Sequence, residues 1–224
     1  MTTSLEGRTI LLAGGTSTVG AVVARAALDR SAEVVVVGRD PAKLQELSAG
    51  LSGVRTLVCD LTDEPSVEAL ANDIHTEIGR IDGVLNLVGG WRGGGGLAGQ
   101  TDVDYRFLER SLTSLRHVSR AFDDDLRSSD AGRLAIISST AVARPLAGGA
   151  NYAAVKAASE AWSRAVAQGF AKAARDASGP QVAASVVFRV KALDGLEQTL
   201  ADAFLGLWDA EAADINDTVV TLGS

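Results

Sequence analysis

The chain has 224 residues, of which 46% are hydrophobic and 22% are charged, and its formal net charge is −7. This composition predicts a single globular domain, residues 1–224, that is large enough to bury a substantial core. The negative charge disfavours nucleic acid as the main partner, and no apolar run reaches the ~18 residues of a membrane span. Because residues 1–8 also lack the pattern of a signal peptide, we expect a cytoplasmic protein that does not bind membranes.

Residues that commonly bind metals are scarce. Cys59 is the only cysteine, and His75 and His117 are the only histidines. They provide no intrachain disulfide and little material for a zinc site or a serine hydrolase triad. The carboxylates of Asp123-Asp124-Asp125 would point in different directions on a helix, so we interpret them as a solvated helix end. We expect no metal site.

Short β-branched runs alternate with longer amphipathic stretches along the chain. The runs at residues 34–37 and 84–88 are apolar on both faces, which is typical of parallel strands covered by helices on both sides. Asp40-Pro41 and Asp63-Glu64-Pro65 are helix start signals. We therefore predict an α/β fold with a Rossmann-like, doubly wound parallel sheet and helices on both faces. The predicted strands are Thr9 to Ala13, Glu33 to Gly38, Arg55 to Cys59, Gly83 to Val88, Arg133 to Ser138 and Gln181 to Phe188.

A glycine-rich turn follows the first predicted strand and precedes a helix. In that context, glycines and exposed backbone N–H groups can hold a pyrophosphate. Gly14 and Gly20 match the outer glycines of the dinucleotide fingerprint, whereas Thr18 stands where a middle glycine normally lets the backbone approach the ligand. The alternative is a turn that binds nothing. The residues expected to contact the dinucleotide here are Gly14, Thr16, Ser17, Thr18, Val19 and Gly20.

Arg39 follows the second predicted strand, directly after Gly38. An acidic side chain at this position would accept a hydrogen bond from a ribose 2′-hydroxyl, whereas an arginine can pair with a 2′-phosphate. Arg39 therefore favours NADP(H), with NAD(H) possible, and Ser17 could add a hydroxyl to the same phosphate. The alternative is that Arg39 is a solvated loop residue.

Tyr152 and Lys156 are four residues apart, and Ser139 precedes Tyr152 by thirteen residues. On a helix this spacing stacks the ammonium beside the phenol, within reach of the hydroxyl. Because a nearby cation favours the phenolate, we expect Lys156 to lower the pKa of Tyr152 towards neutral pH. The three residues are a candidate proton-transfer site. For an isolated match, the alternative is an exposed tyrosine and lysine on a solvated helix.

The glycine turn, Ser139, Tyr152 and Lys156 resemble the short-chain dehydrogenase/reductase family in order and spacing, over nearly the whole chain. The family implies hydride transfer between a nicotinamide cofactor and a small carbonyl or alcohol. By this resemblance Tyr152 would be the general acid or base and would also contact the cofactor, and Ser139 would orient the substrate oxygen. Lys156 would support the charge and hold the nicotinamide ribose.

Two further segments carry the resemblance. Asp60-Leu61 follows the third predicted strand, and Asn86-Leu87-Val88-Gly89 follows the fourth. The family pattern implies that Asp60 and Leu61 border the adenine, and that Asn86 and Gly89 lie beside the ribose and the end of the sheet.

The chain departs from the family pattern at three places. Ser111 stands where a helix asparagine backs the lysine, Arg189-Val190 replaces a Pro-Gly turn after the sixth strand, and the segment up to Leu196 is short. Ser111 and Arg189, together with Thr18 in the glycine turn, motivate an alternative function, a catalytically weak or inactive dinucleotide-binding sensor or scaffold.

The loop from Val88 to Gly94, which contains Trp91, resembles the dihydropteridine reductase branch. That resemblance implies a conjugated heteroaromatic substrate, on which the indole can stack. Arg39 and Ser139 depart from this branch, which typically has an acidic residue and lacks the serine. The alternative is that Trp91 packs on its own loop while the glycines supply flexibility.

The predicted helix from Asn151 to Lys172 contains Ala157, Ala158, Ala161 and Ala165. In the resembled family this helix joins subunits, which implies a homodimer or homotetramer. The alternative is that the alanines pack only within one subunit.

Overall fold

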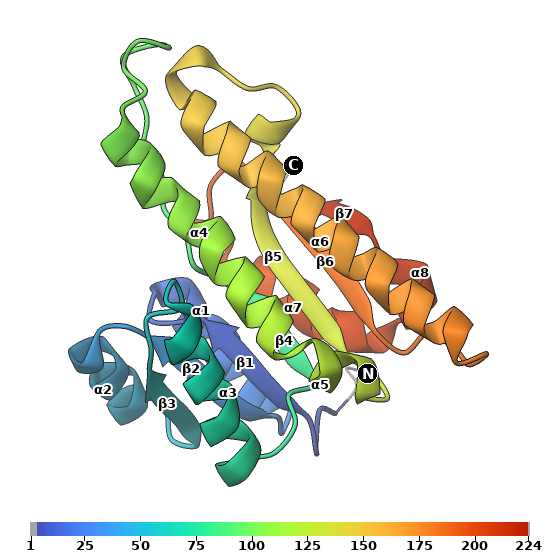
Figure 1. Ribbon diagram of the computed structural model, residues 1–224. Coiled ribbons are helices and arrows are strands. Elements are labelled where there is room, and N and C mark those ends of the chain that lie inside the picture. Colours follow the sequence, from blue (N-terminus) through green and yellow to red (C-terminus); the bar gives the residue numbers. More distant parts are fainter. Residues whose placement is uncertain (1–3, 224) are drawn as a thin grey trace.

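The computed structural model describes residues 4–223 and contains one sheet with helices on both sides (Figure 1). The strands are β1 (Thr9–Ala13), β2 (Glu33–Gly38), β3 (Val54–Val58), β4 (Gly83–Asn86), β5 (Arg133–Ser139), β6 (Ala184–Val190) and β7 (Thr218–Thr221). The α-helices are α1 (Thr18–Asp29), α2 (Pro41–Gly50), α3 (Glu64–Glu77), α4 (Asp102–Ala121), α5 (Asp123–Ser128), α6 (Ala150–Asp176), α7 (Glu197–Leu205) and α8 (Ala212–Ile215). Short 3₁₀ helices lie at η1 (Thr140–Val142), η2 (Ala147–Gly149) and η3 (Gly206–Asp209).

The seven strands are parallel and follow the order β3-β2-β1-β4-β5-β6-β7. The chain winds outward from β1 in one direction and then returns to build the other half from β4. The predicted doubly wound sheet is therefore confirmed. In such sheets, ligands bind at the carboxyl ends of the strands, next to the point where the order reverses. Here that point lies between β1 and β4.

Alternating residues of β1 pack into two separate hydrophobic cores. Ile10 and Leu12 pack with α1, α2 and α7, whereas Leu11 and Ala13 pack with α3, α4 and α6. Because both faces of the sheet are covered, every residue of β1 is buried. This explains why residues 10–13 form a continuous apolar run rather than an alternation. In Figure 1, α4 and α6 lie side by side across the front of the sheet.

The predicted helix starts are confirmed at α2 and α3. The Asp40 carboxylate accepts hydrogen bonds from the backbone N–H groups of Ala42 and Lys43, and Pro41 is the first helical residue. Asp63 caps α3 in the same way, through the N–H of Ser66. Each cap satisfies N–H groups that have no partner within the helix.

Strand β6 differs from the sequence-based prediction. It runs from Ala184 to Val190 rather than from Gln181 to Phe188, so Arg189 and Val190 belong to the strand and not to a turn. They pair with Ser138 and Ser139 of β5. The physical reason is that arginine retains the backbone N–H that proline lacks, so the ladder can continue. The sequence analysis also missed β7, a four-residue edge strand.

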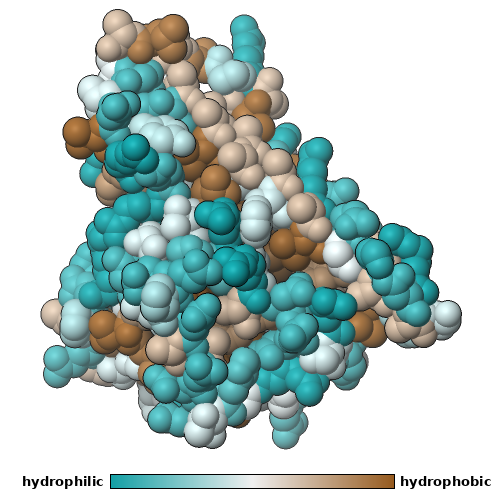
Figure 2. Space-filling view, viewed as in Figure 1, coloured by the Kyte–Doolittle hydropathy of each residue, from teal (hydrophilic) through white to brown (hydrophobic). Residues whose placement is uncertain are grey.

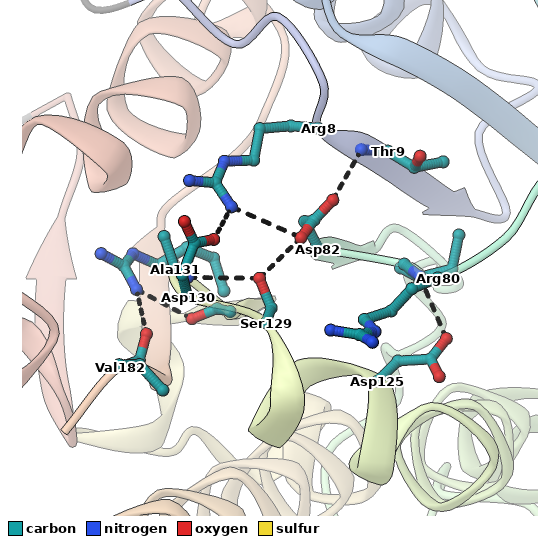
Figure 3. Close-up of polar contacts among 12 residues, drawn as sticks. Arg8, Thr9, Arg80, Asp82, Asp125, Ser129, Asp130, Ala131 and Val182 are labelled. Atoms are coloured by element: carbon teal, nitrogen blue, oxygen red, sulfur yellow. Dashed lines mark hydrogen bonds and ion pairs between the residues drawn. The ribbon is translucent and has the colours of Figure 1, made fainter. Parts of the chain in front are cut away.

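Polar side chains join the amino-terminal ends of β1, β4 and β5, at the edge opposite the proposed cofactor site (Figure 3). Asp82 accepts hydrogen bonds from the Thr9 N–H at 3.0 Å and from the Ser129 hydroxyl at 2.6 Å. Arg8 forms ion pairs with Asp82 and Asp130. This network ties strands that are distant in sequence.

Arg133, the first residue of β5, is buried at the same edge and binds backbone oxygens instead of a carboxylate. Its guanidinium donates to four carbonyls at 2.9–3.0 Å, and burial lowers its pKa to about 10. The side chain thereby connects the sheet to the segment around η3. The carbonyls are those of Gly132, Val182, Leu207 and Ala210.

Asp125 of α5 is not fully solvated, contrary to the sequence-based interpretation of the aspartate run. Its Oδ2 accepts from the Ile81 N–H at 3.0 Å and lies 2.9 Å from the His75 ring.

Within residues 4–223, no helix combines the length and apolar character needed to cross a bilayer.

Candidate active site

Ser139, Tyr152 and Lys156 line one cavity of about 1140 Å³ at the carboxyl end of the sheet. Ser139 is the last residue of β5, and the other two lie in the first turns of α6. Because β5 packs against α6, the hydroxyl, the phenol and the ammonium are brought together from separate parts of the chain. The alternative of an exposed tyrosine and lysine on a solvated helix does not describe this arrangement.

Lys156 is 7% exposed, and its Nζ donates to the Ile137 carbonyl of β5 at 2.7 Å. Burial lowers the pKa of this ammonium to about 8, and the negative charge of Glu160 opposes that shift. Nζ lies 5.8 Å from the centre of the Tyr152 ring. The lysine is therefore placed to respond to a change of charge at the phenol.

Burial raises the pKa of Tyr152, and a hydrogen bond with Ser139 opposes the rise. The expectation that Lys156 lowers this pKa below its ordinary value is therefore wrong for the structure described. Desolvation of the phenolate is the largest influence on this pKa, and the Ser139 hydrogen bond offsets only part of it. Ser139 Oγ also accepts from the Ala141 N–H at 3.2 Å, which fixes the hydroxyl at the start of η1.

The glycine turn after β1 leaves no room for side chains at two positions. Gly14 has a φ of +80°, and a Cβ there would lie 2.7 Å from Val88 Cγ2. A Cβ on Gly20 would lie 2.0 Å from the Gly15 carbonyl oxygen, so the first turn of α1 packs directly on the loop. Ser17 caps that helix by accepting from the Gly20 N–H at 3.3 Å. The amino-terminal end of α1 thus faces the region where a pyrophosphate is expected.

A second cavity, of about 390 Å³, lies beside the glycine turn between β2, β3 and α4. Sequence reasoning missed three of its lining side chains, Lys43, Phe107 and Arg110. Lys43 follows Arg39 by four residues across the start of α2, a spacing that could have suggested a second cation. Arg110 lies 3.5 Å from the Asp60 carboxylate. The predicted cofactor residues that line this cavity are Gly14, Thr16, Ser17, Arg39, Asp60, Leu61 and Gly89.

Four further residues singled out in the sequence lie in different places. Asn86 is 5% exposed at the end of β4, lines neither cavity, and accepts from the Ser114 hydroxyl at 3.4 Å. Thr18 is the first residue of α1 and faces the groove between α1 and α2, whereas Val19 lines the larger cavity. Ser111 lines the smaller cavity, and its hydroxyl donates to the Leu108 carbonyl of its own helix at 2.8 Å.

Trp91 is 61% exposed and lines the larger cavity. Its ring also lies against its own loop, since a Cβ on Gly93 would approach Trp91 Cζ2 to 3.0 Å. The two alternatives for this side chain are therefore compatible.

Gln100 ties the glycine-rich loop to the start of α6. Its side-chain nitrogen donates to the carbonyls of Gly94 and Gly148 at 3.1 and 3.0 Å. Its side-chain oxygen accepts from the N–H of Asn151, the residue before Tyr152, at 3.1 Å. The Gly94 N–H adds a backbone bond to Gly148 at 2.7 Å. In Figure 1 the two loops meet at the same end of the molecule.

The chain is similar to curated proteins over parts of its length. It is 33% identical over 124 residues to a hydroxy-methyl-oxo-hexahydroindene-carboxyl-CoA reductase of Mycobacterium tuberculosis, a match that covers 52% of this chain and 47% of the relative. It is 28% identical over 167 residues to the 3-oxoacyl-acyl-carrier-protein reductase of Salmonella typhimurium, covering 74% of this chain and 68% of the relative. The chain thus spans about half the length of the first relative and about two thirds of the second.

A solved structure agrees with the fold over almost the whole chain. A gluconate 5-dehydrogenase from Burkholderia cenocepacia, in complex with NADP and tartrate, superposes with a TM-score of 0.81 at 19% identity and covers 98% of this chain and 94% of its own. At this identity the likeness supports the fold alone. Neither curated relative described above is a dihydropteridine reductase, so the resemblance to that branch stays a prediction. Residues 8–174 match the sequence profile of the short chain dehydrogenases, and the chain belongs to that family.

Proposed function

We propose that the protein is an NADP(H)-preferring oxidoreductase in which Tyr152 is the general acid or base. The observation that carries the proposal is that the two cavities adjoin, since Ser17 and Gly89 line both of them. A dinucleotide held at the glycine turn would therefore lie next to the cavity that contains Ser139, Tyr152 and Lys156. The complex of the solved relative with NADP supports the choice of cofactor class.

The residues present fit a dinucleotide. Gly14 and Gly20 form a cradle that a Cβ would fill, and the amino-terminal end of α1 offers N–H groups to a pyrophosphate. Arg39 and Lys43 place two cations in the smaller cavity, where they would hold a 2′-phosphate.

When bound, the nicotinamide supplies hydride transfer to or from a substrate carbon. In this proposal Tyr152 gives or takes the proton at the attached oxygen or nitrogen, while Ser139 orients that atom by a hydrogen bond. Lys156 stabilises the phenolate and holds the nicotinamide ribose. The buried surroundings of the phenol limit its access to water and strengthen these charge interactions.

The lining of the larger cavity favours a small carbonyl, alcohol or conjugated heteroaromatic substrate. Trp91, Leu146 and Leu193 contribute apolar surface, and the Trp91 indole is exposed enough to stack on a planar ring. The name of the 3-oxoacyl-acyl-carrier-protein reductase supports the reduction of a carbonyl compound.

Exchanging Arg39 for aspartate tests the cofactor preference. Arg39→Asp is expected to weaken NADP(H) binding about tenfold or more, because it replaces a cation that pairs with the 2′-phosphate by a repelling carboxylate. The affinity of this variant for NAD(H) should stay unchanged or increase. Fluorescence titrations with both cofactors measure the change, and Arg175→Asp, at the far end of α6, is the charge-matched control. An unaltered NADP(H)/NAD(H) ratio would remove Arg39 from the proposal.

A cofactor-binding sensor or scaffold remains the second candidate. The observation that favours it is Ser111, whose hydroxyl bonds to its own helix and does not replace the family asparagine behind Lys156. Tight NADP(H) binding without cofactor oxidation or reduction across a panel of carbonyls and alcohols would support the sensor. Measurable turnover of any panel member would support the enzyme.

We also propose that α4 and α6 join two or four copies of the chain in the cytoplasm. A band of weakly hydrophobic residues follows α6 across the face in Figure 2. The helix exposes small side chains there, which would let a second helix approach closely. These residues are Ala154, Ala157, Ala158, Ala161 and Ala165.

Substituting one of these alanines tests the assembly. Ala158→Arg is expected to lower the particle mass from two or four times the 23.0 kDa chain to that of a monomer, since a long charged side chain would separate the helices. Light scattering after gel filtration measures the mass. Ala49→Arg, on the exposed side of α2, should leave it unchanged. A monomeric wild-type protein would refute the proposal.

A further inference from the structure

A buried ion pair lies one helical turn beyond Lys156. Glu160 of α6 is 4% exposed, and both of its carboxylate oxygens are engaged. Arg189 of β6 donates to them from Nε at 2.8 Å and from Nη2 at 2.6 Å, a bidentate arrangement. The Ser138 hydroxyl of β5 adds a third bond at 2.6 Å. The carboxylate is therefore fixed in position and kept ionised, and its pKa is lowered by the Arg189 and Ser138 hydrogen bonds, against the effect of burial.

This pair and the candidate active site share the same strand. Adjacent residues of β5 bind the two charged side chains of α6. The Ile137 carbonyl accepts a hydrogen bond from Lys156 Nζ, and the Ser138 hydroxyl donates one to the Glu160 carboxylate. The only charged group that acts appreciably on Lys156 among the described residues is Glu160, which favours the ammonium against the penalty of burial. Arg189 is present because the chain carries an arginine where the family pattern has a proline, which also lets β6 extend to this level.

We propose that Glu160, oriented by Arg189, is a positioning residue that sets the charge state of Lys156. The inference rests on the proposed function for its catalytic meaning, but the electrostatic coupling itself concerns only residues of this chain. The ion pair exists because Arg189 stands where the family pattern has a proline. It would thus favour the protonated form of Lys156, the lysine that supports the phenol of Tyr152.

The charges around the site give the coupling a definite sign. Tyr152 and Glu160 lie on α6 together with Lys156. Arg189 of β6 and Arg164 of α6 both lower the pKa of Glu160 by their positive charge. Strand β5 contributes only neutral groups, the Ser138 hydroxyl and the Ile137 carbonyl. Removing the carboxylate takes away the anion that favours the ammonium, and so disfavours its charge. Removing the guanidinium acts through the carboxylate: burial then raises the pKa of Glu160, which is less ionised and supports the ammonium less. A merely structural pair would leave the Lys156 midpoint unchanged.

The titration of Lys156 can be followed directly by NMR of ¹³C-labelled lysine, since the chain has only four lysines and a Lys156→Met variant identifies the signal. In Glu160→Gln the midpoint is expected to fall by about one pH unit, and in Arg189→Met to fall by a smaller amount. The double variant should match Glu160→Gln, since Arg189 acts on Lys156 through the carboxylate. Arg189→Lys, which keeps the charge, should stay close to wild type.

No shift in Glu160→Gln, or a double variant that differs from Glu160→Gln, would overturn the inference. Thermal unfolding and circular dichroism establish that each variant is folded; if Glu160→Gln is not, a lower midpoint in Arg189→Met and a wild-type midpoint in Arg189→Lys support the inference, and no difference between these two variants overturns it.

The pH profile of kcat separates this inference from the proposed function. Activity should decline as pH rises through the Lys156 midpoint, and that limb should move with the NMR value. The expected NMR shifts in a protein without turnover would retain the coupling and reject the enzyme, whereas turnover without NMR shifts would do the reverse.

Discussion

Replacing Tyr152 with phenylalanine is expected to lower kcat by about 10²- to 10⁴-fold, the usual contribution of a positioned general acid or base. The change removes the only oxygen of the side chain while keeping the ring that fills this part of the cavity. Cofactor affinity should change by less than about threefold, because the glycine turn and Arg39 lie on other elements. Steady-state kinetics and a binding titration on the same sample measure both effects.

The second tyrosine of the chain is a matched control. Tyr105 lies on α4, is 38% exposed and does not line the larger cavity, so Tyr105→Phe should retain wild-type kcat. A Tyr152→Phe enzyme with an unchanged rate would reject the proton-transfer role. Equal losses in both variants would point to a general effect on the fold.

Replacing Arg133 with methionine is expected to lower the free energy of unfolding by about 3 kcal/mol. Methionine retains much of the aliphatic stem but donates no hydrogen bonds. The four carbonyls that the guanidinium now serves would lose their donor, and they connect β5 to Val182, Leu207 and Ala210. Relief of a buried charge offsets part of this loss. Urea denaturation measures the difference.

Arg55→Met on β3 provides the comparison. Arg55 is also a strand arginine, but its side chain is 51% exposed and forms a surface ion pair with Glu33 at 2.9 Å. Such pairs contribute about 0–1 kcal/mol, so this variant should remain near wild type. If both substitutions had the same small effect, the carbonyl contacts of Arg133 would not be important to stability.

The sheet could be predicted from sequence wherever a strand is buried on both faces or a helix start is marked by local chemistry. The run from Val34 to Val37 and the Asp-Pro start at Asp40 carry such information within a few residues. Gly14 and Gly20 likewise occupy positions where a Cβ would clash, as expected for a tight turn, while their part in cofactor binding stays a prediction.

Elements that depend on distant partners could not be predicted in this way. Strand β7 has only four residues, and its place beside β6 depends on Asn216, which accepts from the Ser185 N–H and donates to the Ala167 carbonyl, each at 3.0 Å. No local pattern indicates those partners.

The candidate site also combines features that the sequence predicts with features that depend on distant packing. Ser139, Tyr152 and Lys156 could be found by spacing, but the direction of the Tyr152 pKa shift depends on how deeply the phenol is buried, which spacing does not reveal. The pair of Glu160 and Arg189 joins residues 29 positions apart and depends on the packing of α6 against β6.

The bonds made by Gln100 have a consequence for ligand capture. Eight residues from Gly89 to Gly96 include six glycines, a composition that would sample many conformations as a free peptide. Folding already restricts the later part of this segment through Gln100 and Gly148, before any reactant arrives. An incoming molecule therefore meets a partly preorganised wall beside Trp91, and less of its interaction energy is lost to ordering the protein.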